Sequence, residues 1–197
     1  WKERYKDVLI VKSLEELEGA EIISLTGVSN VTGEDFSERI RRARRAFPEA
    51  ILGVDAAQMT SYGSLDVKRL GVDFVAFSGH KFGAPMGIGG LIIRKELAER
   101  LRPLLYGGEM VDAVNAEGVP SFSEVPARLE AGTLPVGAIF GLSAAVKKWL
   151  EDGFQHEKVV KLAERAAAGL GEITGVEVLA ANGAIVTFKI DGVHAHD

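Results

Sequence analysis

Short runs of hydrophobic residues, rich in β-branched and aromatic members, recur along the chain and are typical of buried strands. The four clearest runs are residues 21–25, 51–54, 74–77 and 89–94. Between the first two runs, residues 35–47 repeat their hydrophobic positions with a helical period, which ends before Pro48. A strand, a helix and a strand in this order predict a right-handed parallel crossover. The pattern therefore predicts an α/β fold with a mostly parallel sheet flanked by helices.

Other stretches carry weaker patterns. Residues 8–11 predict a short strand, and a helix with capping-box spacing is predicted to begin at Ser13. A short helix is predicted at 95–101. Residues 106–135 are rich in Gly, Pro, Ser and Asn and show little periodicity, which predicts a long loop region.

The pattern in the last third of the chain predicts a second structural domain. Two helices are expected at 136–150 and 154–170, followed by strands at 176–179 and 184–190 around an Asn-Gly turn. Part of a smaller α+β domain is therefore expected after Gly153. The predicted division is 1–152 for the larger domain and 153–197 for the smaller one.

Composition narrows the class of protein. At 197 residues and 47% hydrophobic residues the chain can bury a sizeable core. A net charge of -5 argues against nucleic acid as a partner, and the basic run at 39–45 is interpreted as a solvated helix face. No apolar run approaches the roughly 20 residues that cross a bilayer, and no charged-then-apolar leader opens the chain, so a cytoplasmic protein with no membrane partner is expected.

Metal and thiol chemistry are not predicted. The chain contains no cysteine, which excludes disulfides and thiolate ligands within it. His194 and His196 have a spacing that could contact a metal, but no third ligand is evident nearby. No metal site is therefore expected.

Polar residues gather where two predicted strands end. Asp55 and Gln58 follow the run at 51–54, and the run at 74–77 is followed by Ser78, His80 and Lys81. Ligands of open α/β sheets bind beyond the carboxyl ends of the strands. An amine for a Schiff base, a carboxylate for a ring nitrogen and donors for a phosphate together match pyridoxal 5'-phosphate.

Each of these residues also has a structural interpretation. Lys81 could be a surface lysine in a glycine-rich turn, Asp55 a helix N-cap, and His80 a histidine whose hydrogen bonds are met locally. Asn30 could cap its own loop. Asp73, Glu109 and Arg128 are interpreted as structural: a turn cap, a loop charge and a salt-bridged anchor.

Several ordered motifs carry a family resemblance. V-D-A-A-Q at 54–58, D-F-V-A-F-S-G-H-K at 73–81 and P-M-G-I-G at 85–89 resemble the class V aminotransferase family, in particular the group II cysteine desulfurase and selenocysteine lyase branch. The resemblance extends to T-G-V-S-N-V-T-G at 26–33, G-G-E-M at 107–110 and R-L-E-A-G-T at 128–133. It therefore covers most of the chain in order.

The resemblance implies a fold-type-I pyridoxal-phosphate transferase fold, an amino-acid substrate, a homodimer and a Schiff base on Lys81. It also assigns a role to each remaining candidate. In the cofactor ring, Asp55 is implied to bind the nitrogen, Ala57 to pack against the face and Gln58 to bind the phenolic oxygen. Ser78 and His80 are implied to bind the phosphate. Asn30 is implied to bind the substrate carboxylate.

The chain also departs from the family. Intact members are about twice as long, so an N-terminal part and an extreme C-terminal part are expected to be missing, including the cysteine nucleophile of desulfurases. Gly27 and Met86 replace residues that are commonly His and Thr. Without cysteine, aminotransferase, lyase and epimerase-like reactions stay open. A truncated non-catalytic assembly module is the alternative, and an ordinary phosphate binder is weaker because no G-x-G-x-x-G follows the first strand.

Overall fold

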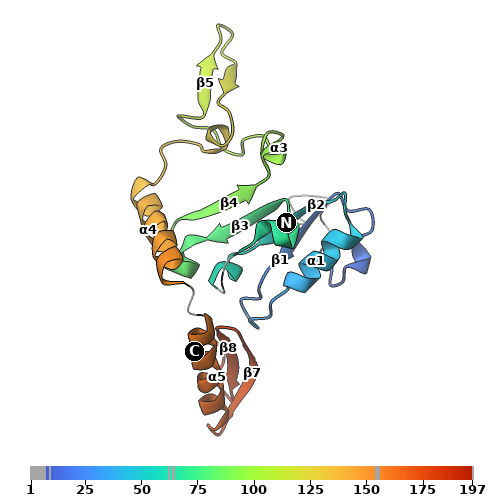
Figure 1. The fold of residues 1–197 in the computed structure, drawn as a ribbon, viewed down its shortest axis with the longest axis vertical. Coiled ribbons are helices and arrows are strands. Elements are labelled where there is room, and N and C mark those ends of the chain that lie inside the picture. The colour runs from blue at the N-terminus through green and yellow to red at the C-terminus, as the bar shows by residue number, and fades with distance from the viewer. Residues whose placement is uncertain (1–7, 9, 62, 64, 154–155, 197) are drawn as a thin grey trace.

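A four-stranded mixed sheet forms the centre of the molecule (Figure 1). The computed structural model describes residues 8, 10–61, 63, 65–153 and 156–196. The strands, in spatial order, are β1 (Ile22–Thr26), β2 (Ile51–Asp55), β3 (Phe74–Ser78) and β4 (Gly89–Ile93). β1, β2 and β3 are parallel, and β4 runs antiparallel to β3. The predicted mostly parallel sheet is confirmed.

Short helices and turns precede, connect and follow these strands. The helices are α1 (Ser37–Ala46), α2 (Val67–Leu70) and α3 (Lys95–Ala98), and the 3-10 turns are η1 (Glu15–Leu17), η2 (Met59–Ser61) and η3 (Gly79–Phe82). α1 begins where the Asp35 carboxylate accepts a hydrogen bond from the Ser37 N–H at 2.7 Å. It ends at Ala46, before Pro48, as the sequence predicted.

The core lies on one face of the sheet. Val54 and Val75 are fully buried on adjacent strands, and they pack with Ile40 and Ala43 of α1 in one hydrophobic cluster. Leu17 of η1 joins the same cluster. The alternation of the strands then places their remaining side chains on the opposite face.

Truncating this core by one carbon atom gives a first prediction. Ile40→Val is expected to lower the free energy of unfolding by about 0.5–1.5 kcal/mol, because Ile40 is fully buried and its neighbours relax only partly. Urea denaturation followed by circular dichroism measures this loss. Ile22→Val is the matched control, because Ile22 is 63% exposed. Equal losses in the two variants would contradict the burial of Ile40 in the core.

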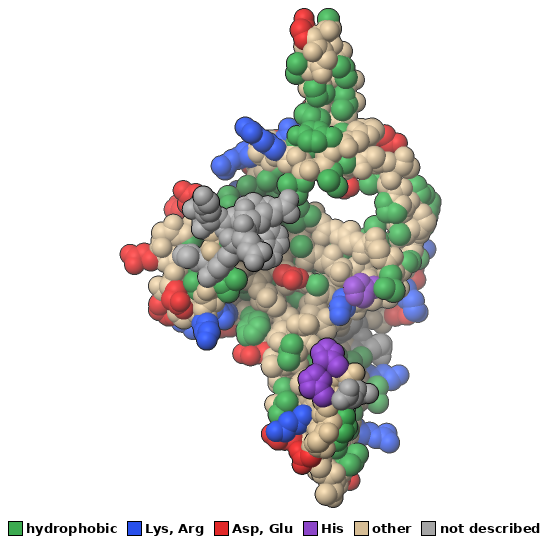
Figure 2. Space-filling view, turned by 180° about the vertical axis from the view of Figure 1, so that it is seen from behind, with side chains coloured by type: hydrophobic (Ala, Val, Ile, Leu, Met, Phe, Trp, Pro, Cys, Tyr) green, Lys and Arg blue, Asp and Glu red, His purple; other side chains and the backbone are tan. Residues whose placement is uncertain are grey.

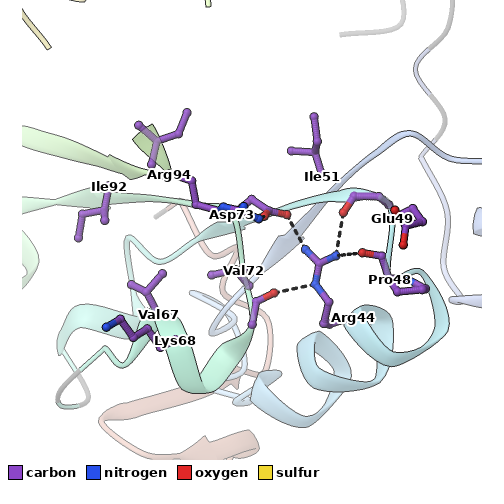
Figure 3. A pocket seen from close by; sticks show the side chains of 13 residues that line it. Arg44, Pro48, Glu49, Ile51, Val67, Lys68, Val72, Asp73, Ile92 and Arg94 are labelled. Carbon is purple, nitrogen blue, oxygen red and sulfur yellow. Dashed lines mark hydrogen bonds and ion pairs between the residues drawn. The ribbon is translucent and has the colours of Figure 1, made fainter. Parts of the chain in front are cut away.

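One carboxylate joins several elements at the amino end of β3. Asp73 accepts hydrogen bonds from the Leu52 N–H at 2.8 Å, from the Arg44 guanidinium at 2.5 Å and from Arg94 at 2.9 Å. Arg44 also donates to the carbonyls of Phe47, Pro48, Ala50 and Gly71, several of which are visible in Figure 3. Asp73 is structural, as predicted, but as the centre of an ion-pair network.

The predicted loop region at 106–135 contains a hairpin, so that prediction was wrong. β5 (Val111–Val114) pairs antiparallel with β6 (Pro120–Phe122), and the hairpin projects away from the sheet (Figure 1). The Asn115 side chain accepts a hydrogen bond from the Val119 N–H at 2.7 Å, which closes the turn. A 3-10 turn, η4 (Ala127–Leu129), follows.

Arg128 anchors this region, but it forms no salt bridge with a described residue, contrary to the prediction. Its guanidinium donates to the carbonyls of Ala98, at 3.2 Å, and Glu99. These carbonyls lie at the end of α3, where a helix leaves backbone acceptors without partners of its own. The side chain therefore caps a helix.

The N-terminal prediction was also partly wrong. Residues 8, 10 and 11 form no strand, and Leu9 lies outside the described residues. The helix expected from Ser13 is limited to η1, although the Glu16 carboxylate accepts the Ser13 N–H at 3.0 Å, as its capping-box spacing suggested.

The C-terminal elements form a separate small sheet. α4 (Val136–Asp152) precedes α5 (His156–Gly171), β7 (Val176–Asn182) and β8 (Ile185–Ile190), and the two strands pair antiparallel. Figure 1 shows α5, β7 and β8 together below the main sheet. The predicted helices and strands are present here, while the domain division at 152 and 153 stays a prediction.

Candidate functional site

The carboxyl ends of the three parallel strands bring polar side chains to one edge, which we call the carboxyl edge (Thr26, Asp55 and Ser78). Thr26 pairs with Asp55 in the β1–β2 ladder, and Asp55 pairs with Ala76 in the β2–β3 ladder. The side chain of Asp55 is exposed, whereas Val54 before it is buried. Asp55 therefore lies on the sheet face opposite the core. Sequence reasoning missed Thr26, which the parallel register could have indicated.

Lys81 lies in η3, the turn that directly follows β3. The turn is closed by hydrogen bonds from the Gly79 N–H to the Ile88 carbonyl at 2.9 Å and from the Ala84 N–H to the Gly79 carbonyl at 3.1 Å. A side chain at Gly79 would begin 3.0 Å from that Ile88 oxygen, so the close turn favours glycine. The side chains of His80 and Lys81 are exposed and make no hydrogen bond or ion pair with another described residue.

Asp55 and Gln58 lie on the turn after β2. One carboxylate oxygen of Asp55 accepts the Ala57 N–H at 2.9 Å, which fixes the side chain at the edge. The Gln58 side-chain oxygen is buried without a hydrogen-bond partner among the described residues. A buried side-chain oxygen without a donor is costly, so the turn suits a ligand that can donate a hydrogen bond. η2, which begins at the next residue, packs against η3.

The donor set at this edge fits pyridoxal phosphate. It offers an exposed amine on Lys81, a carboxylate on Asp55 and an amide on Gln58, with the Ser78 hydroxyl and the His80 ring beside them. Asn30 is exposed on the loop that leaves β1 at the same edge. The structure thus brings the predicted cofactor residues to adjoining turns, while their individual roles remain predictions.

A cavity of about 790 Å³ lies elsewhere. It is lined by Arg44, Asp73 and Arg94 at the amino end of β3 (Figure 3). Lys81 follows the carboxyl end of the same strand, so the cavity and Lys81 lie at opposite ends of β3. The polar groups of Arg44 and Asp73 already bind each other and the backbone, so we assign this cavity no ligand. Among the described residues, no three His, Cys, Asp or Glu side chains are grouped so as to hold a metal ion.

Comparison with models of known protein families identifies the family of the chain. The model of the class-V aminotransferases matches residues 8–197. The chain belongs to the aminotransferase class-V family. The resemblance inferred from the sequence is thereby confirmed, and the pyridoxal-phosphate cofactor expected from it agrees with this family.

The proteins that are similar to this chain include cysteine desulfurases. A probable cysteine desulfurase 2 of Mycobacterium leprae is 37% identical over 194 residues, which are 94% of this chain and 46% of that protein. The solved cysteine desulfurase CsdA of Escherichia coli is 36% identical with a TM-score of 0.82, over 93% of this chain and 47% of that one. A solved C-DES mutant, with glycine covalently linked to its pyridoxal phosphate, is 27% identical with a TM-score of 0.70, over 87% of this chain and 47% of that one.

These structural similarities confirm that this chain has the predicted fold of the fold-type-I pyridoxal-phosphate enzymes. The chain spans about half the length of the curated relatives it matches. Within the described residues, no helix is long and apolar enough to cross a membrane.

Proposed function

We propose that this chain is a pyridoxal-phosphate-dependent enzyme, or part of one, that acts on an amino acid in the manner of a cysteine desulfurase, selenocysteine lyase or aminotransferase. The observation that carries the proposal is the convergence of Lys81, Asp55 and Gln58 on adjoining turns at the carboxyl edge. A cytoplasmic location belongs to the same proposal.

Each residue has a defined task in this proposal. When bound, the cofactor supplies an electron-deficient ring that accepts electrons from a breaking substrate bond. Lys81 holds the aldehyde and moves protons at the substrate carbon, and Asp55 keeps the ring nitrogen protonated. Ala57 packs on the ring and Gln58 binds its phenolic oxygen. Phosphate binding falls to Ser78 and His80, and the substrate carboxylate to Asn30.

The sulfur-removing step needs a nucleophile from outside these residues. A desulfurase transfers sulfur to a cysteine thiolate, and the 197 residues contain none. The thiolate therefore comes from residues other than these 197, or the reaction is one of the other pyridoxal-phosphate reactions of amino acids.

Exposed apolar groups support a homodimer as part of the proposal. Val114 and Val119 of the projecting hairpin are 61% and 59% exposed, and Phe140 of α4 is 72% exposed. Figure 2 shows hydrophobic side chains along the projecting hairpin. Because monomers rarely expose contiguous apolar surface, a second copy of the chain is the partner we propose.

A non-catalytic assembly module is the second candidate, favoured by the open face of the sheet. Ile22 is 63% exposed and Leu91 is 51% exposed on the face opposite the core. A chain that needs another polypeptide to cover this face could retain the fold without the chemistry. This candidate predicts a folded protein that does not take up pyridoxal phosphate.

Reductive trapping tests the proposal. The purified chain is incubated with pyridoxal phosphate, its visible absorbance is recorded, borohydride is added and the labelled peptides are mapped by mass spectrometry. The proposal predicts an imine absorbance band and one cofactor label per chain, on Lys81. A folded chain with no label, or with label spread over many lysines, would favour the assembly module.

A further inference from the structure

The loop between β1 and α1, residues 27–36, has a compact conformation that displays Asn30. The Ser29 hydroxyl accepts the N–H groups of Val31 at 3.2 Å and Thr32 at 3.0 Å, and the Gly33 N–H donates to the Ser29 carbonyl at 3.0 Å. The Asn30 side chain is exposed at the tip and makes no hydrogen bond with another described residue. Its position therefore depends on the loop backbone.

The hairpin of β7 and β8 holds this loop from the other end of the chain. The Asn182 side-chain amide donates to the Thr32 carbonyl at 2.8 Å, and the Thr187 hydroxyl donates to the Val31 carbonyl. The two bonded carbonyls are those of the residues that directly follow Asn30. In Figure 1 the loop between β1 and α1 reaches toward β8.

Gly33 allows the β1–α1 loop and the β7–β8 hairpin to approach each other closely. A Cβ atom at this position would lie 2.2 Å from the Asn182 carbonyl oxygen, and Gly33 has a φ of +72°. Only glycine accommodates both the left-handed backbone and the approach of the hairpin. The loop and the hairpin therefore meet through backbone atoms, a contact that leaves little room for an alternative docking position.

We propose that Asn182 and Thr187 are positioning residues for Asn30, so that the C-terminal hairpin controls how tightly the substrate carboxylate is bound. The inference rests on the proposed role of Asn30 in substrate binding. Neither Asn182 nor Thr187 is assigned contact with the substrate or the cofactor.

The physical reason is the cost of ordering the loop. Without the hairpin bonds, the carbonyls of Val31 and Thr32 bind water and the loop samples more conformations, so substrate binding has to restore one of them. The coupling is reciprocal, so a substrate held by Asn30 strengthens the docking of the hairpin.

The experiment uses Thr187→Val, which removes the donor and keeps the side-chain shape. Amide hydrogen exchange of the loop at 27–36 is measured first, without any ligand. The protein loaded with pyridoxal phosphate is then titrated with L-alanine, which has the substrate carboxylate but no sulfur. Thr187→Ser restores the hydroxyl, and Thr174→Val makes the same change at an exposed residue near the opposite end of the hairpin.

We expect Thr187→Val to accelerate exchange in the loop and to weaken L-alanine binding by about fivefold, as for loss of one hydrogen bond. Affinity for pyridoxal phosphate stays unchanged, Thr187→Ser recovers most of the loss, and Thr174→Val has no effect. Gly33→Ala, which forces the hairpin away, is expected to weaken L-alanine binding further.

Asn30→Ala separates the two layers of the proposal. If Asn30→Ala weakens L-alanine binding and Thr187→Val does not, the positioning role is overturned and the role of Asn30 stands. If Asn30→Ala has no effect on L-alanine, the proposed role of Asn30 fails and the inference fails with it. Unchanged hydrogen exchange in Thr187→Val overturns the hairpin contact regardless of ligand.

Discussion

Lys81→Ala is expected to abolish covalent attachment of pyridoxal phosphate altogether. The other candidate groups at the carboxyl edge bind the cofactor without a covalent bond, so borohydride would find no imine to reduce. The label that maps to Lys81 in the unmodified chain should disappear, and so should any turnover of an amino acid. Absorbance before reduction and mass spectrometry after it measure the loss.

The matched control is Lys68→Ala, an exposed lysine on α2 at the other end of the sheet. This variant should keep the label and the absorbance, because no candidate cofactor residue lies near it. Circular dichroism confirms that both variants fold, since Lys81 is exposed and its loss removes no core contact. Label retained in Lys81→Ala would contradict the assignment of the cofactor lysine.

The central sheet was predictable because its strands are buried on at least one face. The runs around Leu52 and Val75 are short, apolar and β-branched, and the structure pairs them in the predicted parallel sense. The run at 8–11 has a similar composition but forms no strand at its described residues. A strand needs a ladder partner, which composition alone does not reveal.

The hairpin of β5 and β6 was missed because its strands are short and exposed, so they show no alternation of buried positions. Asn115 and Gly118, the first and last residues of its tight turn, are the residues that such a turn favours at these positions. That signal could have identified the turn. The strong side-chain pattern that marks a core strand is absent from these two strands.

At the candidate site, the sequence predicted which residues gather but not what holds them. Asp55 and Lys81 were predicted at strand ends, and parallel register brings their turns together. The contacts of Asn182 and Thr187 with the Asn30 loop join segments about 150 residues apart. Such pairings depend on how two packed units meet, which hydrophobic periodicity does not encode.

Arg44 illustrates the same limit within a helix. The basic run at 39–45 was interpreted as a solvated face, and Arg41 and Arg45 do pair with Glu38 at the surface. Arg44, however, lies beside the buried Ala43 and donates to the Asp73 carboxylate and to the Ala50 carbonyl, at the amino ends of β3 and β2. Its place next to the apolar stripe of α1 could have indicated this role.

Asp73→Ala is expected to lower the free energy of unfolding by about 3–5 kcal/mol, because it leaves the partly buried Arg44 charge without its carboxylate. The Leu52 N–H would lose its acceptor as well. Urea unfolding at neutral pH measures the change. Glu38→Ala, which breaks the exposed pairs with Arg41 and Arg45, serves as control and should cost far less. Similar costs for the two variants would contradict a structural role for Asp73.

The same network gives a pH dependence with a defined sign. Burial by itself would raise the pKa of Asp73, but hydrogen bonds from the Leu52 N–H, Arg94 and Arg44 outweigh it and hold the pKa below the ordinary value of 3.8. The carboxylate therefore contributes stability that is complete above pH 3.8 and is lost as the pH falls through its lower pKa in the folded protein. The difference in unfolding free energy between the unmodified chain and Asp73→Asn should be constant near neutral pH. It should shrink as the pH falls below 3.8. Because the other carboxylates are common to both proteins, they cancel in the difference. A gap that stayed constant down to acid unfolding would show that folding does not lower the pKa of Asp73.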